Sequence, residues 1–146
     1  MRVVTHNLAH PGQPRRLPTG LAPHAVFSDP QVASVGLTES DAAARGIDHL
    51  VSVRRYADTA YGWALEDTTS FVKILTDPGT GLLFGAHLIG PQAPTLLQPL
   101  LQAMMLGQTV EQVARDVLYV HPALTEVVEQ ALLDAADQRA SIHAGS

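Results

Sequence analysis

The sequence predicts an α+β fold, with an antiparallel sheet of about five strands and helices packed on it. Strand-like segments, in which apolar residues alternate, lie mostly in the first part of the chain, and helix-like segments dominate the second part. Short turns such as 77–81 separate the strands, and strands joined by a short turn pair antiparallel. Strands grouped before helices are typical of an α+β domain.

Each predicted strand is a short apolar run bounded by turn residues. In chain order, these strands lie at 25–27, 32–37, 49–56, 71–75 and 82–84. The turn signal at 77–81 predicts a hairpin of the last two strands. We interpret residues 60–69, which contain the only Trp, as a loop. Residues 1–22 are interrupted by Pro and Gly, which predicts a frayed element followed by a linker.

Capping residues and apolar periodicity predict the helices. These lie at 38–46, 94–106, 110–115 and 124–134. Thr38 with Asp41 favours a helix start, and Gly46 ends that helix. The second helix is apolar nearly all round, so it needs cover on two sides. Two interpretations stay open for it: a helix that begins at Pro94, or one that is kinked at Pro99.

The composition is that of an ordinary packed domain. In 146 residues, 46% are hydrophobic and 16% are charged, which favours a folded core over disorder. The nine Lys and Arg residues are scattered and the formal charge is −5, which argues against a nucleic-acid partner. No run of 18 apolar residues predicts a membrane-spanning helix, and no signal-peptide pattern is visible, so we expect a cytoplasmic protein without a membrane partner.

Other patterns predict neither thiol chemistry nor a cofactor site in this chain. The sequence has no cysteine, which excludes disulfides, thiolate metal sites and a cysteine nucleophile. The glycine-containing run 79–85 leads into a strand, whereas a dinucleotide fingerprint opens a helix, so a turn is favoured. His6 and His10 have helical spacing but no nearby carboxylate, so a solvated pair is favoured over a metal site.

The segment 119–126 is the best candidate for a site. Pro122 favours an extended conformation for His121, which places this histidine in a turn before the last helix. In one helix, His121 and Glu126 would lie about 140° apart, so they can meet only if the histidine is in the loop and the glutamate in the first helical turn. There Glu126 could accept the imidazole N–H and fix its tautomer, which predicts a general acid–base pair. The alternative is a helix-capping segment with an incidental histidine.

Four motifs in chain order resemble a known family. They are Phe27–Glu39, Phe71–Leu75, Gly85–Gly90, and His121-Pro122 with Glu126. The stretch from Pro23 to Leu133 is similar to the C-terminal dimerisation domain of the FAD-dependent pyridine nucleotide-disulfide oxidoreductases, which include glutathione, lipoamide and mercuric reductases. The resemblance therefore covers most of the chain.

The resemblance implies a two-fold homodimer in which His121 and Glu126 of each subunit complete the active site of the other. His121 is then the acid–base group, and Glu126 orients it. A cis His121–Pro122 peptide is implied, with its backbone near the partner subunit's FAD. FAD, NADPH, the FAD and nicotinamide domains and a low-molecular-weight disulfide substrate belong to the parent enzyme. For the isolated chain we expect no bound cofactor, no metal ion and no catalysis.

The same resemblance divides the chain into three parts. Residues 1–22 are similar to the end of the preceding FAD domain and a linker, residues 23–136 form the dimerisation domain, and residues 137–146 are expected to form a flexible tail. The redox cysteines are then expected in an N-terminal part of the parent protein. This agrees with the absence of cysteine here.

One branch of the family is indicated by two departures from its common pattern. Ala123 stands where a Thr often follows His-Pro, and Pro99 interrupts the long helix. Segments 60–68 and 97–104 are similar to the same branch. That branch reduces a thiol disulfide with NADPH. The alternatives are the same domain from a glutathione, lipoamide or mercuric reductase-like protein, and a self-standing dimerisation or binding module without catalysis. A stand-alone acid–base enzyme using His121 and Glu126 is a further alternative.

Overall fold

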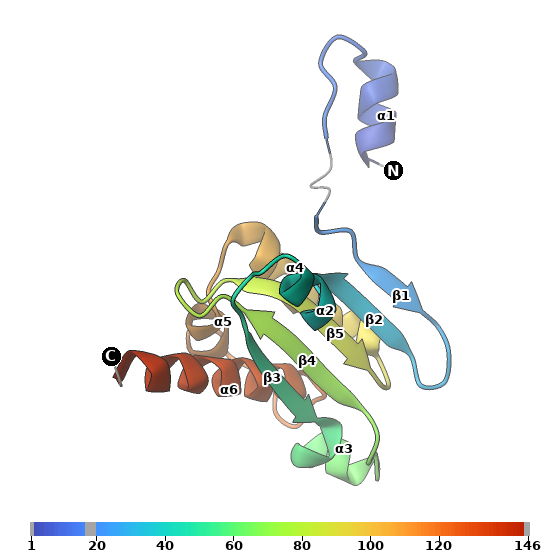
Figure 1. Ribbon diagram of the computed structural model, residues 1–146. Coiled ribbons are helices and arrows are strands. Elements are labelled where there is room, and N and C mark those ends of the chain that lie inside the picture. The colour runs from blue at the N-terminus through green and yellow to red at the C-terminus, as the bar shows by residue number, and fades with distance from the viewer. Residues whose placement is uncertain (1, 17–19, 145–146) are drawn as a thin grey trace.

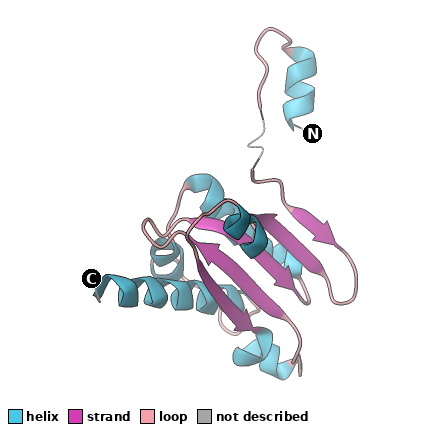
Figure 2. Ribbon diagram, viewed as in Figure 1, coloured by secondary structure: helices cyan, strands magenta, loops and turns pink. Residues whose placement is uncertain are grey.

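The structure is a computed structural model that describes residues 2–16 and 20–144. Its centre is a five-stranded sheet in the order β1-β2-β5-β4-β3, with every neighbouring pair antiparallel (Figure 1). The strands are β1 (His24–Val26), β2 (Val32–Gly36), β3 (Leu50–Arg55), β4 (Phe71–Thr76) and β5 (Leu83–Ile89). The predicted α+β fold and the number of strands are confirmed, and Figure 2 shows the strands together with helices at the faces and ends of the sheet.

The β4–β5 hairpin forms at the predicted turn. The Asp77 carboxylate accepts hydrogen bonds from the backbone N–H groups of Gly79 and Thr80, and Gly81 has a φ of +79°, which glycine adopts at little cost. The strand after the turn is longer than predicted, since β5 continues to Ile89. It continues because it lies in the middle of the sheet and pairs with both β2 and β4.

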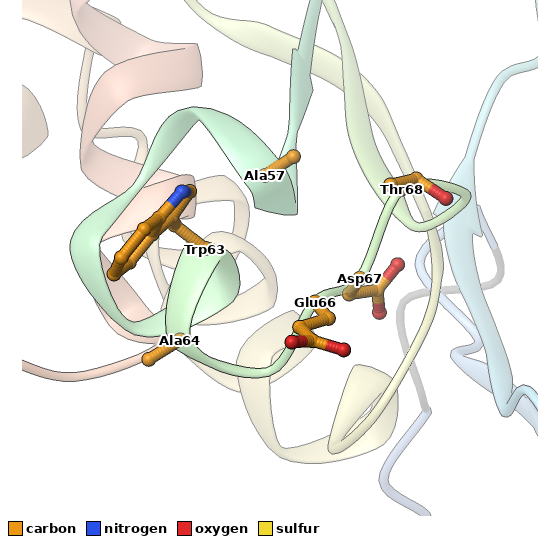
Figure 3. Close-up of a pocket in the computed structure, with 6 residues that line it drawn as sticks. All are labelled: Ala57, Trp63, Ala64, Glu66, Asp67 and Thr68. Atoms are coloured by element: carbon orange, nitrogen blue, oxygen red, sulfur yellow. The ribbon is translucent and has the colours of Figure 1, made fainter.

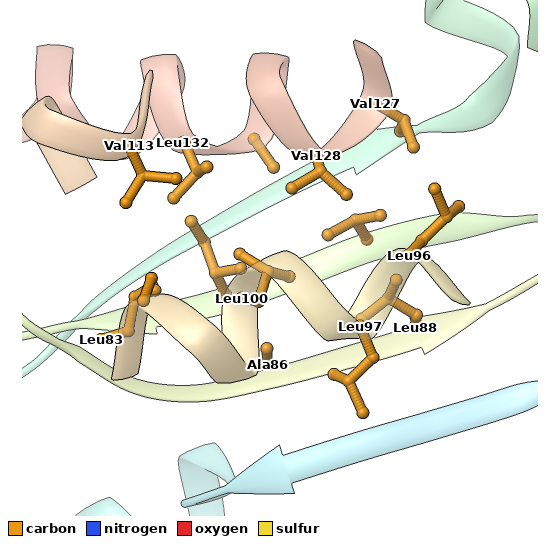
Figure 4. Close-up of a cluster of buried hydrophobic side chains, with 14 of the residues drawn as sticks. Leu83, Ala86, Leu88, Leu96, Leu97, Leu100, Val113, Val127, Val128 and Leu132 are labelled. Carbon is orange, nitrogen blue, oxygen red and sulfur yellow. The ribbon is translucent and has the colours of Figure 1, made fainter. Parts of the chain in front are cut away.

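One face of the sheet packs against the helices of the second half. α4 (Ala93–Leu106) and α6 (Thr125–Ala144) lie on the sheet, and α5 (Val110–Arg115) packs against α6. Val35, Ala86 and Ile74 are side by side across β2, β5 and β4 and are buried on this face. Figure 4 shows Leu100 of α4 and Leu132 of α6 in the cluster above Ala86. Each such fully buried aliphatic side chain contributes about 1.5 to 3 kcal/mol, which fixes α6 on the sheet.

The opposite face of the sheet carries α2 (Glu39–Ala44). The predicted cap is present, because the Thr38 side chain accepts from the Asp41 N–H and the Asp41 carboxylate accepts from the Thr38 N–H. Glu39 forms an ion pair with Lys73 of β4. Lys73 is next to Ile74, which faces the helices of the second half, so the Lys73 side chain points to the other face of the sheet. Helices thus lie on both faces of the sheet.

The long helix α4 is one element across Pro99. Pro94 lies in its first turn, where a missing N–H costs nothing, and Gly107 ends it in the left-handed conformation, as predicted. Its buried residues face the sheet, whereas Met105 and Leu106 at its end are exposed. Sheet packing therefore accounts for most of its apolar surface, and the exposed end accounts for the rest.

The segment predicted as a loop at 60–69 is partly helical. It contains α3 (Ala60–Ala64), which follows the 3-10 helix η1 (Tyr56–Asp58). The Thr59 hydroxyl donates to the Tyr56 carbonyl and accepts from the Gly62 N–H, so a single buried residue caps both short helices. The sequence interpretation missed this cap because α3 is only five residues long.

Both ends of the described chain are helical. The N-terminal segment contains α1 (Arg2–Ala9), whose Val4 and Leu8 side chains are exposed. At the other end, α6 continues to Ala144, although the sequence predicts that the helix gives way to a tail at 137–146. Residues 125–144 contain no Gly or Pro, and Arg139 binds Glu111 and the carbonyl of Pro78. Among the residues described, no helix is both long and apolar enough to cross a membrane.

Candidate active site

His121 and Glu126 meet at the start of α6. His121 lies in the loop between α5 and α6, and Glu126 lies in the first turn of α6, as the spacing predicts. The His121 Nδ1 and Glu126 Oε1 atoms are 2.6 Å apart. A carboxylate can only accept, so Nδ1 carries the proton that is donated to Glu126. The peptide between His121 and Pro122 is cis, as the resemblance implies.

The two members of the pair differ strongly in exposure. The His121 side chain is 71% exposed, whereas the Glu126 side chain is 15% exposed. Because Nδ1 is engaged by Glu126, the second ring nitrogen, Nε2, is the one that can exchange a proton with a molecule outside this chain. The arrangement is an accessible imidazole whose Nδ1 is bound by a largely buried carboxylate.

Glu126 is ionised in this setting. The hydrogen bond from His121 is the largest cause that lowers the pKa of this carboxyl below its ordinary value; burial opposes the shift, and the Ala123 N–H, 3.1 Å from Oε2, supports it. Its place in the first turn of α6 also favours a negative charge, because the helix dipole is positive there. Both carboxylate oxygens are therefore engaged, and the carboxylate has a fixed orientation toward His121.

Apolar side chains are exposed beside this pair. Val117, Leu118 and Val120 are 45%, 99% and 70% exposed. Contiguous exposed apolar residues are typical of surfaces that bind another protein chain. The sequence interpretation included Val120 in the candidate segment 119–126 but did not single out Val117 or Leu118, although the run Val117 to Val120 before a predicted turn carries the signal.

A separate cavity lies around α3. Its volume is about 480 Å³, and its lining includes Trp63, which is 76% exposed, and Glu66 (Figure 3). Neither His121 nor Glu126 lines it. The His121–Glu126 pair therefore lies at an open surface of this chain and does not line this cavity.

The other histidines first considered for metal binding have different contacts. The rings of His6 and His10 stack with centroids 4.6 Å apart, and both rings reach backbone carbonyls, those of Gln13 and His6. Within 2–16 and 20–144, no group of three or more His, Asp or Glu side chains is placed to hold a metal ion.

The sheet, its helices and the site at the start of α6 together define the class. A family model described as the dimerisation domain of pyridine nucleotide-disulphide oxidoreductases matches residues 22–132, and the chain belongs to this family. Over 111 residues it is 56% identical to mycothione reductase of Mycobacterium tuberculosis, a stretch that covers 76% of this chain and 24% of that protein. It is also 37% identical over 120 residues to dihydrolipoyl dehydrogenase of Halobacterium salinarum, covering 82% of this chain and 25% of that protein.

Solved structures agree with this fold. LpdA from Mycobacterium tuberculosis superposes with a TM-score of 0.80 at 24% identity, covering 90% of this chain and 28% of that one. The HOCl-induced flavoprotein disulfide reductase RclA from Escherichia coli gives a TM-score of 0.78 at 25% identity, covering 90% and 30%. The chain thus spans about a quarter of the length of the curated relatives it matches. The branch indicated by Ala123, Pro99 and segments 60–68 and 97–104 is that of mycothione reductase, and the 56% identity supports it.

Proposed function

We propose that this chain is the dimer-forming part of a disulfide reductase that reduces mycothiol disulfide with NADPH. In this proposal, the domain forms the two-fold interface, and His121 with Glu126 completes the active site of the partner subunit. The chain alone is inactive, because it carries neither the redox cysteines nor the FAD and nicotinamide domains of such an enzyme. The NADPH preference and the cytoplasmic location implied by the sequence resemblance are part of the same proposal.

The observation that carries the catalytic part is the unequal exposure of the pair. An imidazole that is 71% exposed is not enclosed by the described part of its own chain, which supports a role on a molecule that a second chain binds. A covered carboxylate 2.6 Å from Nδ1 keeps the ring in one orientation and one tautomer. These features are those of an acid–base group presented to another surface.

The chemistry asked of the pair is proton transfer between thiols. When a dithiol of the parent enzyme attacks a disulfide, Nε2 of His121 accepts the proton of the attacking thiol and returns it to the leaving thiolate of the substrate. Glu126 stabilises the imidazolium that exists between these steps. Positioned proton transfer of this kind contributes about 10² to 10⁴ in rate.

The exposed tip of the loop suits contact with a flavin held by the partner subunit. His121 and Pro122 are both exposed. When bound in the parent enzyme, FAD would pass electrons from NADPH to the redox disulfide, which is thereby reduced to the dithiol. The role proposed for His121 and Pro122 is to lie against the partner's FAD with their backbone, while the His121 ring faces the thiols.

The first test is the His121→Ala substitution in the parent enzyme. We expect most disulfide reduction to be lost while flavin binding, followed by its absorbance spectrum, persists. His143→Ala is a matched control, because His143 lies in α6 and its ring bonds the backbone carbonyl of Arg139. Turnover of the His121→Ala enzyme equal to that of the control would contradict the proposed function.

A further inference from the structure

The loop that presents His121 is held by few contacts of its own. Between the end of α5 and Ala123, the side chains of Val117, Leu118 and Val120 are exposed, so packing does not fix them. Tyr119 differs, because it is partly buried and its hydroxyl donates to the backbone carbonyl of Val113, 3.1 Å away. Tyr119 is therefore the inward anchor of this stretch.

The acceptor of this bond belongs to a fixed part of the molecule. Val113 is buried, and it lies in the last turn of α5, where helix carbonyls lack intrahelical partners. The Tyr119 hydroxyl supplies a partner for one of them. Because α5 packs against α6, the bond ties the loop to the same helix pair that carries Glu126.

The other side of the loop is tied directly to α6. The Ala123 N–H donates to Glu126 Oε2, and the Glu126 N–H donates to the Ala123 carbonyl, at 3.1 and 3.2 Å. His121 thus lies midway between two anchors, two residues after Tyr119 and two residues before Ala123. Loss of either anchor leaves the histidine attached on one side only.

Packing alone does not hold the Tyr119 ring in place. Tyr119 lines a cavity of about 260 Å³ together with Pro99, Gln102 and Thr125. A ring that borders a cavity has room to shift, since interior side chains are normally fixed by contacts on all sides. The hydroxyl bond to Val113 therefore gives the ring a fixed contact in addition to its packing.

We propose that Tyr119 is a positioning residue, which holds His121 within reach of Glu126 through the bond of its hydroxyl to the Val113 carbonyl. The proposal rests on the proposed function only in assuming that the reaction uses His121. Burial, with the nearby charge of Glu129, raises the pKa of Tyr119 to about 12. The hydroxyl therefore keeps its proton and remains a donor at neutral pH.

The test is the Tyr119→Phe substitution in the full 146-residue chain. Two NMR readouts report on the pair itself: the low-field resonance of the His121 Nδ1 proton, and the pKa of Glu126 followed through its carboxyl carbon. Tyr56→Phe is a matched control, because the Tyr56 hydroxyl also donates to a backbone carbonyl, that of Pro91, outside this loop. Val120→Ala controls for a change within the loop, since Val120 is exposed.

In Tyr119→Phe, we expect the low-field resonance to be lost and the pKa of Glu126 to rise toward its ordinary value. Both controls should keep both readouts, although Tyr56→Phe, like Tyr119→Phe, should lower the melting temperature. If Tyr119→Phe keeps both readouts as the controls do, the proposal is overturned, whatever the melting temperature.

A second measurement needs no substitution. In the unmodified chain, the Tyr119 hydroxyl proton should be protected from exchange with water, and a freely exchanging hydroxyl would overturn the proposal even if the variant failed to fold. In the parent enzyme, Tyr119→Phe should lower kcat by up to about 100-fold, as for a catalytic group displaced by about 1 Å, with KM little changed. An unchanged kcat combined with lost NMR readouts would contradict the role of His121 and leave its placement by Tyr119 intact.

Discussion

Replacing Glu126 with Gln tests how the carboxylate supports His121. Gln has nearly the same shape, and its amide oxygen can still accept a hydrogen bond from Nδ1, which lies 2.6 Å from Oε1 of Glu126. Its NH2 group cannot accept the Ala123 N–H, which Oε2 now accepts at 3.1 Å. The substitution therefore removes the charge of the pair and one backbone hydrogen bond.

The size of the effect follows from the kind of bond that is lost. A hydrogen bond to a charged group contributes about 1.5 to 3 kcal/mol, compared with about 1 kcal/mol for a neutral one. The loss in stabilisation of the imidazolium is then about 0.5 to 2 kcal/mol, or about 2- to 30-fold in kcat. The effect on folding should be smaller, under about 1 kcal/mol, because the His121 partner is 71% exposed to solvent.

The assay compares steady-state disulfide reduction by the parent enzyme with either substitution, Glu126→Gln or Glu129→Gln. Glu129 lies one turn further along α6, so its substitution changes the helix charge equally without touching the bond to His121. We expect a fall in kcat for Glu126→Gln alone, with KM nearly unchanged. Equal kcat values for the two variants would refute the role assigned to the carboxylate.

Three further predictions concern acid stability, the core and the surface. Because the pKa of Glu126 lies below its ordinary value of 4.5, the ionised carboxylate stabilises the fold above that pH. This contribution is lost as the pH falls through the lowered pKa. In the Glu126→Gln variant, the melting temperature should therefore fall less steeply below about pH 4.5. Leu100→Ala should lower the free energy of unfolding by about 2 to 5 kcal/mol in denaturant titration, whereas Leu118→Ala, at a 99% exposed site, should change it by less than about 0.5 kcal/mol. Leu118→Asp should weaken dimerisation measured by light scattering at micromolar concentration, because it places a charge in an apolar surface, and an unchanged dimer would exclude Leu118 from the interface.

Local signals in the sequence were sufficient for most of the framework. The Thr38–Asp41 cap, the turn at 77–81 and the helix end at Gly107 form as predicted, because each depends on a few neighbouring residues. The meeting of His121 and Glu126 was predictable for the same reason, since a loop followed by one helical turn determines it.

Other features depend on contacts that are distant in sequence. The extension of β5 to Ile89 comes from pairing on both sides, and the length of α6 is supported by Arg139 binding Glu111. The bond from Tyr119 to Val113 depends on the course of the whole loop, which periodicity does not describe. These features could not be predicted from sequence patterns, because contacts between residues distant in the sequence determine them.

The most direct test of the account is a heterodimer of two defective parent subunits. One subunit carries His121→Ala with an intact redox dithiol, and the other carries an intact His121 with the dithiol cysteines replaced by serine. If His121 acts on the partner subunit's site, the heterodimer should regain disulfide reduction, at up to about half the rate of the unmodified dimer, because one of its two sites is complete. A heterodimer as inactive as either defective homodimer would contradict the claim that this domain supplies its acid–base pair to the partner.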